Sequence, residues 1–161
     1  EMNENNSVTI GFSENQLLVR LGSIELVSRL VEGKYPDYRQ IIPAEFHTEA
    51  IVEKDDFQKA IRATSLFATS GLFDIALYFQ PGVGVDVRAA DAARGEQTTI
   101  CEAEVLGETQ HVAVNYRYVL DGIGVLETSK VRWSMVDASN PCVLKGEGDT
   151  EFLYVVMPIR Q

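Results

Sequence analysis

Alternating apolar and polar positions open the chain and predict three antiparallel strands. They cover residues 7–12, 16–21 and 24–33, and turn residues separate them at 13–15 and 22–23. Three such strands have one apolar face to hide, and this stretch contains no helix that could cover it. Residues 33–43 follow, with two prolines and a pattern that suits neither helix nor strand. We interpret this tract as an ordered linker between two units.

From residue 44 the pattern changes to a unit of strand, helix and three strands. The first strand covers 45–54, and Asp55 is predicted to cap the helix, with Gln58 placed as in a capping box. Strands are then predicted at 73–80, 83–90 and 97–106. One face of the helix is apolar at the i, i+3, i+4, i+7 spacing and comprises Phe57, Ala60, Ile61, Thr64 and Ala68.

The same order of elements then repeats. A strand at 110–115 leads to a helix capped by Asn115 that runs to about Leu126, and strands follow at 130–137, 141–146 and 150–157. We interpret this as an internal duplication of architecture with little sequence identity. It predicts an α+β fold in which two helices lie side by side against one face of a curved antiparallel sheet.

The last ten residues, 152–161, remain apolar almost to the end. Pro158 cannot donate to a strand ladder, so the chain should leave the sheet there. Because chain termini are usually polar, the apolar tail suggests that it covers or helps to build a groove. The alternative is a closing core strand with a short exposed end, and these ten residues alone favour that alternative.

Charge and composition limit the classes of function. The chain has 161 residues and a formal net charge of −10, so contact with nucleic acid would require a local basic face.

Cys101 and Cys142 form no metal-binding or disulfide pattern and fit buried thiols in a reducing cytosol. No apolar run is long enough to cross a bilayer, and no signal peptide is recognisable. Because the first residue is Glu1 rather than Met, we expect a piece of a longer protein.

No residue pattern indicates an enzyme, a cofactor or a metal site. His47 and His111 lie in strand patterns without a second ligand at metal spacing, and no Ser or Cys is placed for activation. The 24 acidic residues are scattered and single out no catalytic pair. The glycines at 82–84 and 122–124 lack the Gly-Lys-Ser/Thr continuation of a phosphate-binding loop.

Two groups of helix residues suggest contacts with other molecules. Lys59, Arg62 and Arg117 would form a basic strip for phosphates if the helices lie side by side. The alternative is ordinary solubilising charge on exposed helix faces, and the pattern alone favours it. Leu66 and Phe67 form an apolar pair at a helix end that suits a protein contact, although isolated exposed apolar residues are common.

Four stretches together resemble one family, the bacterial sliding clamp, which is the beta subunit of DNA polymerase III. They are GKYPDYRQIIP at 33–43, AIRATSLFA at 60–68, VNYRYVLDGI at 114–123 and YVVMPIR at 154–160. The match runs over the whole chain but covers only the last two-fifths or so of a family member. It implies that residues 1–43 are the end of the middle clamp domain with the interdomain linker, and that 44–161 are the complete third domain.

The resemblance implies a processivity factor rather than an enzyme. Members form a head-to-tail homodimeric ring that encircles duplex DNA in the cytoplasm, at the nucleoid, and tethers DNA polymerase III. The helices of such a ring line its hole, which implies that Lys59, Arg62 and Arg117 face DNA without reading its sequence. Leu66 and Phe67 would belong to the ring interface. No cofactor, metal or membrane contact is implied.

The family's partner site is a groove for a short peptide with a Gln and bulky apolar residues, carried by the polymerase alpha subunit, the clamp loader and other clamp-motif proteins. Carried over by position, its wall comprises Pro36, Ile41, Leu72, Asn115, Tyr118, Ser139, Pro141, Val155, Val156, Met157, Pro158, Ile159 and Arg160. Aliphatic residues and an adaptable Met suit apolar anchors from varied partners.

The chain departs from the family pattern in three ways. Gln40 stands where many relatives carry Arg, and Gln161 stands where an apolar residue is common. The rest of the middle domain and the whole first domain are missing, so this chain alone should not close a ring. Two other hypotheses stay open on the residues themselves: a stand-alone nucleic-acid-binding or protein-interaction module, and an enzyme, for which no constellation is present.

Overall fold

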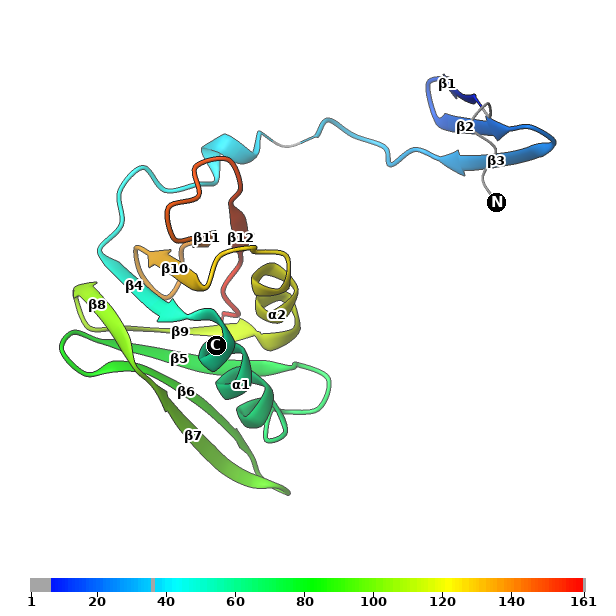
Figure 1. The fold of residues 1–161 in the computed structure, drawn as a ribbon. Coiled ribbons are helices and arrows are strands. Elements are labelled where there is room, and N and C mark those ends of the chain that lie inside the picture. The colour runs from blue at the N-terminus through cyan, green and yellow to red at the C-terminus, as the bar shows by residue number, and fades with distance from the viewer. Residues whose placement is uncertain (1–6, 36, 161) are drawn as a thin grey trace. The chain divides into compact units, whose positions relative to one another are not determined.

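The computed structural model describes residues 7–35 and 37–160 and shows two compact units that divide between Asp37 and Tyr38 (Figure 1). The smaller unit is a three-stranded antiparallel sheet of β1 (Val8–Phe12), β2 (Gln16–Leu21) and β3 (Ile24–Arg29), in that order. The three predicted strands are therefore confirmed, with the third ending earlier than predicted. The described part of this unit contains no helix, and most of its apolar side chains are exposed, with Phe12 at 74% and Ile24 at 66%.

The described residues of the larger unit, 38–160, contain two α-helices and two antiparallel sheets. After a short 3-10 helix, η1 (Tyr38–Gln40), its first half comprises β4 (Thr48–Glu53), α1 (Lys54–Ser65), β5 (Asp74–Gln80), β6 (Gly84–Asp91), β7 (Gly95–Cys101) and β8 (Ala103–Gly107). Its second half comprises β9 (Gln110–Asn115), α2 (Tyr116–Gly124), β10 (Lys130–Met135), β11 (Cys142–Gly146) and β12 (Tyr154–Val156). The predicted order of strand, helix and three strands is confirmed in the second half, whereas four strands follow the helix in the first half.

The two halves exchange their first strands. The four-stranded sheet has the order β7-β6-β5-β9, so it joins three strands of the first half to β9 of the second. The five-stranded sheet has the order β12-β11-β10-β4-β8, so β4 of the first half lies between strands of the second half and β8. The α+β class is confirmed, but the strands are divided between two sheets instead of forming one.

The segment predicted as one strand at 97–106 is two strands in different sheets, and that prediction was wrong. The chain bends at the exposed Glu102 between the buried side chains of Cys101 and Val105. At this corner β6 begins at Gly84, whose φ is +135° and whose missing Cβ would overlap the Cys101 carbonyl oxygen. The bend therefore depends on a close backbone approach from a distant residue, and nothing within 97–106 announces it.

The two helices begin differently. In α2, Asn115 is the cap as predicted, because its side-chain oxygen accepts a hydrogen bond from the Arg117 backbone N–H at 3.0 Å. In α1 the predicted cap was wrong: Glu53 occupies the cap position without a side-chain hydrogen bond, and Asp55 lies in the first turn. There its negative charge interacts favourably with the helix dipole. Helix α2 ends at Gly124, slightly earlier than predicted.

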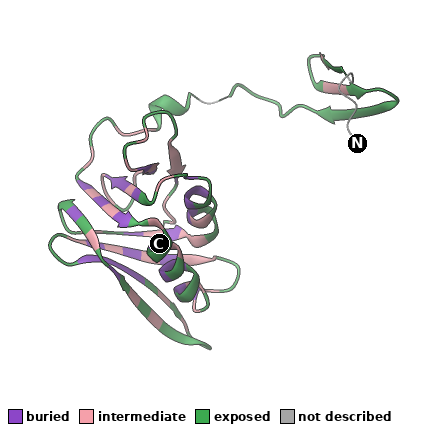
Figure 2. Cartoon of the chain, viewed as in Figure 1, coloured by how far each residue is buried: buried purple, intermediate pink, exposed green. Residues whose placement is uncertain are grey.

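The core lies between the helices and the two sheets (Figure 2). All five residues predicted on the apolar face of the first helix are buried. Trp133 of β10 is fully buried, and it contacts Phe57 of α1 edge-to-face at 6.5 Å between ring centroids and Phe79 of β5 in a stacked arrangement at 5.7 Å. One aromatic cluster thus joins a helix to both sheets, and the helices pack against each other as predicted.

Candidate functional site

The C-terminal segment bridges the two sheets. Residues 154–156 pair with β11, where Val156 lies opposite Cys142. Beyond Val156 the chain leaves the five-stranded sheet ahead of Pro158, as predicted, and Met157 is exposed. The Ile159 backbone N–H then donates to the Ala113 carbonyl oxygen at 2.8 Å, on the free edge of β9. The last residues are therefore held at both ends, by one sheet and then by the other.

An apolar groove of about 440 Å³ lies beside this segment. Seven of the residues predicted for the partner site line it together: Leu72, Asn115, Tyr118, Val155, Val156, Met157 and Ile159. Leu72, Tyr118 and Met157 are each more than half exposed, so large apolar surfaces face solvent here. Concave apolar surface with few polar groups is suited to hold aliphatic or aromatic side chains of a ligand.

Asn115 couples two walls of the groove. Its side-chain oxygen caps α2, while its amide nitrogen donates to the Leu72 carbonyl oxygen at 3.3 Å. The Tyr116 backbone N–H donates to the Phe73 carbonyl oxygen at 2.9 Å. The loop that carries Leu72 is thereby tied to the start of the helix that carries Tyr118. One side chain thus serves both the helix and the shape of the groove.

Two groove residues were missed by the sequence prediction, Gly71 and Tyr154. The Tyr154 ring packs against α2 at Gly122, where an added Cβ would overlap the ring. Burial raises the pKa of Tyr154, and the nearby Asp121 carboxylate and Tyr118 act in the same direction. A glycine inside an apolar helix pattern was the signal that something packs closely there.

The other predicted groove residues lie outside this hollow. Ser139 and Arg160 line a neighbouring hollow of about 420 Å³, which Ile159 shares with the groove. Pro141 and Pro158 are half-buried and Ile41 is exposed, and they line neither hollow. Pro36 and Gln161 lie outside the described residues. The structure thus divides the predicted site into two adjoining hollows with Ile159 between them.

The basic helix residues have local partners. Lys59 forms an exposed ion pair with Asp56 at 3.2 Å, and the Arg117 guanidinium lies 3.6 Å from the centroid of the Phe73 ring. Arg62 is exposed. Helix α1 carries both signs of charge, with Asp55 and Asp56 in its first turn. Any attraction of this helix for phosphate is therefore reduced by its own carboxylates.

The loop with Leu66 and Phe67 is held by a neighbouring hairpin. Leu66 is 70% exposed and Phe67 is half-buried. Arg94, at the β6–β7 turn, donates to the Leu66 carbonyl oxygen at 3.4 Å and to the Ser70 hydroxyl at 2.9 Å. These hydrogen bonds tie the loop to the β6–β7 hairpin, and the apolar Leu66 side chain faces solvent.

The remaining reactive groups have structural surroundings. Burial raises the pKa of Cys101 to about 11 and that of Cys142 to about 12, so neither thiol is activated as a nucleophile. Within the described residues, no group of three or more His, Cys, Asp or Glu side chains could hold a metal ion, and no helix is long and apolar enough to span a membrane. His47 and His111 are both exposed. His111 lies in a strand, β9, as predicted, whereas His47 directly precedes β4.

Comparisons with known proteins agree on one family. The family model for the DNA polymerase III beta subunit, C-terminal domain, matches residues 39–160. The beta sliding clamp of Bacillus subtilis is 28% identical over 155 residues, which is 95% of this chain and 41% of that protein. The beta sliding clamp of Synechococcus elongatus is 28% identical over 157 residues, 96% of this chain and 41% of that protein. The chain therefore spans about two-fifths of the length of these relatives.

Solved structures agree on the fold. The crystal structure of the Bacillus subtilis clamp has a TM-score of 0.79 at 28% identity and covers 99% of this chain and 43% of its own. A clamp from Bartonella birtlesii has a TM-score of 0.81 at 28% identity, with 96% and 41% covered. The DNA polymerase III beta subunit from Pseudomonas aeruginosa shares the fold with a TM-score of 0.82 at 23% identity, with 99% and 44% covered.

These matches confirm the family that the sequence resembles. They also confirm the prediction that the chain is not an enzyme, since the beta subunit is a non-catalytic subunit of the polymerase. The fold, the order of elements and the family model all agree over the larger unit. This chain belongs to the DNA polymerase III beta subunit family, the bacterial sliding clamps, and its residues 39–160 are a C-terminal domain of that family.

Proposed function

We propose that the chain is the C-terminal portion of a sliding clamp whose C-terminal domain docks partner proteins through the apolar groove. The observation that carries this proposal is the position of the C-terminal segment. Held by β11 at one end and by Ala113 at the other, it brings Met157 and Ile159 into one hollow with Leu72 and Tyr118. A peptide with bulky apolar anchors complements this surface. The polymerase alpha subunit, the clamp loader and other clamp-motif proteins are the proposed partners.

We infer that residues 1–43 are the end of a middle domain with its linker and that 44–161 are the complete third domain. The relatives are more than twice as long as the region matched, which leaves room for two preceding domains. The exposed apolar side chains of the β1–β3 sheet support this division, because a three-stranded sheet needs a covering layer and the described residues of this unit contain no helix or second sheet. The missing part of the middle domain would supply it.

In the full-length protein, the proposed ring is a head-to-tail homodimer around duplex DNA in the cytoplasm. Leu66 supports a place in the ring interface because it is exposed on a loop that Arg94 holds in position. Lys59, Arg62 and Arg117 would face DNA. Their attraction is weak because Asp56 pairs with Lys59 and the chain is acidic overall. Weak contacts suit a ring that slides, since encirclement rather than affinity retains it.

The groove is tested by Met157→Ala in the full 161-residue chain. A fluorescein-labelled peptide containing Gln followed by Leu and Phe is titrated with each protein, and anisotropy reports the Kd. Met157→Ala should weaken binding roughly tenfold, because an anchor pocket loses a side chain that is 58% exposed in the free protein. Val83→Ala, at an exposed apolar residue in the β5–β6 turn, is the matched control and should bind as the parent does. Equal affinity of both variants would contradict the groove assignment.

A second experiment uses a ligand of a relative. The Bartonella birtlesii clamp was solved bound to griselimycin. If this chain has an equivalent ligand site, griselimycin should compete with the labelled peptide. If griselimycin does not change the affinity of the labelled peptide, the groove is not the site of that ligand on this chain.

A further inference from the structure

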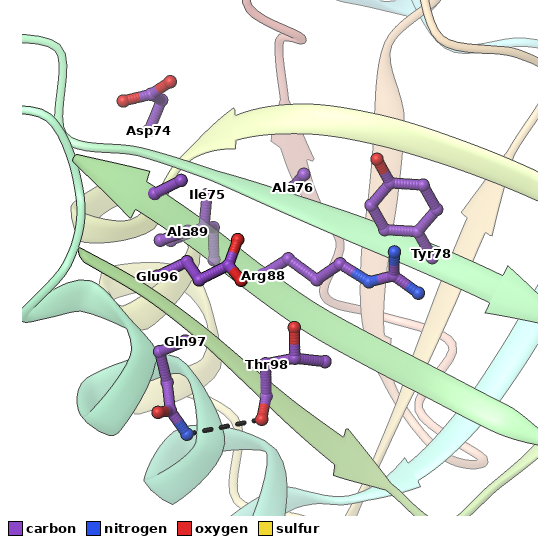
Figure 3. A pocket seen from close by; sticks show the side chains of 10 residues that line it. Asp74, Ile75, Ala76, Tyr78, Arg88, Ala89, Glu96, Gln97 and Thr98 are labelled. Atoms are coloured by element: carbon purple, nitrogen blue, oxygen red, sulfur yellow. Dashed lines mark hydrogen bonds between the residues drawn. The ribbon is translucent and has the colours of Figure 1, made fainter. Parts of the chain in front are cut away.

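The outer face of the four-stranded sheet carries a depression of about 500 Å³ over β5, β6 and β7 (Figure 3). Side chains alternate between the two faces of a strand, and Ile75, Leu77 and Phe79 of β5 are buried on the core side. Helix α1 packs on that core side, where the hydroxyl groups of Thr64 and Thr99 lie 3.2 Å apart. The depression therefore opens on the face of the sheet opposite to α1.

The strand register makes one end of this depression acidic. Ala76 of β5 lies opposite Arg88 of β6, and two residues further along β6, Ala90 lies opposite Glu96 of β7. Asp74, two residues before Ala76, lies at the level of Ala90 because β5 and β6 are antiparallel. Neighbouring strands are about 4.8 Å apart, so the backbones at Asp74 and Glu96 are roughly 10 Å apart. These two carboxylates bound the acidic hollow, with Ala76 and Ala90 between them.

Neither carboxylate of the acidic hollow has a cation beside it in the described part of the chain. The ion pairs of the described residues include neither Asp74 nor Glu96, and Asp74 Oδ1 is buried without a hydrogen bond. Arg88 points away toward Tyr78 (Figure 3), where its guanidinium lies 4.2 Å from the ring centroid and pairs with the buried Asp86. A buried carboxylate oxygen without a donor is costly, and a cationic ligand would remove that cost.

The shape and charge of the acidic hollow suit a long side chain that ends in a planar cation. The methyl groups of Ala76 and Ala90 offer an apolar surface on which the methylene stem of an arginine can lie. A guanidinium carries N–H donors on more than one edge, so it can meet a carboxylate on each side, whereas an ammonium group is a compact point charge. The formal charge of −10 attracts basic ligands to the chain in general, and the hollow would fix where one binds.

We propose that the acidic hollow binds an arginine side chain of a partner protein. The stem of the arginine packs on Ala76 and Ala90, and its guanidinium bridges Asp74 and Glu96 through charge-assisted hydrogen bonds. No residue that lines this depression also lines the apolar groove, so the inference goes beyond the proposed function and does not rest on it. The two sites can therefore fail or succeed separately.

The probe is the tripeptide acetyl-Ala-Arg-Ala-amide, titrated at low salt into the full 161-residue chain labelled with ¹⁵N. The backbone amide signals of Asp74, Ala90 and Glu96 should shift together, with a Kd of roughly 1 mM for a single side chain. The same peptide with citrulline in place of Arg keeps the shape without the charge and should bind about tenfold more weakly. Equal shifts with both peptides, or no shifts at the acidic hollow, would overturn the assignment. Tighter binding of putrescine than of the Arg peptide would assign the hollow to a free polyamine and overturn the protein partner.

Two variants of equal net charge separate the acidic hollow from the general field of an acidic chain. Glu96→Gln removes a carboxylate from the hollow, whereas Glu104→Gln makes the same change at an exposed residue of β8 that does not line it. Glu96→Gln should weaken binding of the Arg peptide roughly fivefold, and Glu104→Gln should leave it as in the parent. Ala90→Leu fills the hollow without changing charge and should abolish the shift at Asp74. Equal weakening by the two Gln variants, or an Asp74 shift that survives Ala90→Leu, would overturn the proposal.

Discussion

The two halves of the larger unit both begin with a strand, a helix and further antiparallel strands, and they differ in how they end. In the first half, the chain runs through β7, bends at Glu102 and continues as β8, which pairs along its length with β4, the first strand of the same half. In the second half, β12 stops at Val156, and the chain then reaches β9, the first strand of that half. In the described part of the chain, a backbone hydrogen bond from Ile159 to Ala113 joins the C-terminal segment to β9.

This difference explains why the candidate site lies in the second half. Pro158 has no backbone N–H. The segment after β12 therefore cannot pair with β9 along its length as β8 pairs with β4. Ile159 lines both the groove and the neighbouring hollow that Ser139 and Arg160 line. Among the described strands, none pairs with β9 on the side of Ile159, whereas β8 pairs with β4 in the first half.

The largest effect on stability is expected from a substitution at Gly107, at the end of β8, where this strand pairs with β4. Gly107 and Gly95 have nearly the same backbone conformation, with φ of +92° and +95°, but an added Cβ overlaps the His47 carbonyl oxygen only at Gly107. Gly107→Ala should therefore lower the free energy of unfolding by about 3 kcal/mol, against about 1 kcal/mol for Gly95→Ala. Urea unfolding of both variants measures the difference. Equal losses would mean that the close approach at the end of β8 is unimportant.

A smaller effect is expected in the second half at Gly122. Gly122→Ala forces the Tyr154 ring away from α2, which should lower stability by roughly 2 kcal/mol and weaken peptide binding through the groove. Gly124→Ala, in the same helix, meets no neighbouring atom and should leave stability unchanged or raise it by up to about 1 kcal/mol. Thermal unfolding and anisotropy titration test the pair. A stabilised Gly122→Ala variant would show that Tyr154 does not depend on this contact.

The helix starts of the two halves offer a third comparison. Asn115→Ala removes the cap of α2 and the hydrogen bond to Leu72, and we expect a loss of about 1 kcal/mol. Glu53→Ala removes no cap hydrogen bond, only an exposed ion pair with Lys130, and should change stability by less than about 0.5 kcal/mol. Chemical denaturation measures both, and similar losses would contradict the difference in capping.

The smallest effect is expected at alkaline pH from the buried thiols, one in each half. Cys101 and Cys142 have pKa values raised to about 11 and about 12 from an ordinary 9.0. Above pH 9 the unfolded chain releases protons that the folded chain retains, so stability falls as pH rises. Each thiol should cost roughly 0.8 kcal/mol at pH 9.5 and almost nothing at pH 7. Cys142→Ala should reduce this pH dependence, and a slope identical to the parent would exclude burial of that thiol.

Much of the fold followed from periodicity. The buried face of α1 was predicted residue by residue, because a helix packed on one side shows its core positions at a fixed spacing. The duplicated order of elements was visible for the same reason. The cap of α1 was not predicted correctly. Asp55 and Glu53 are both plausible near a helix start, and the choice depends on where β4 ends its pairing with β10.

The candidate site was predictable only in part. Resemblance to the family indicated Leu72, Tyr118 and Met157, and the structure brings them together. It did not indicate Tyr154, whose place depends on the missing side chain of Gly122. Nor did it separate Ser139 and Arg160 into a hollow of their own, because that separation depends on where the C-terminal segment meets β9, at the hydrogen bond between Ile159 and Ala113.

The sequence by itself determined which residues form strands and helices, which faces are buried, and that the pattern occurs twice. Only the tertiary structure decided that the halves exchange their first strands, that the chain bends at Glu102, and that the tail leaves a hollow on each side of Ile159. The physical reason is the range of the interactions. Periodicity reports the burial of a residue relative to its neighbours in the chain, whereas strand pairing and close backbone approach join residues far apart, each with several competing partners.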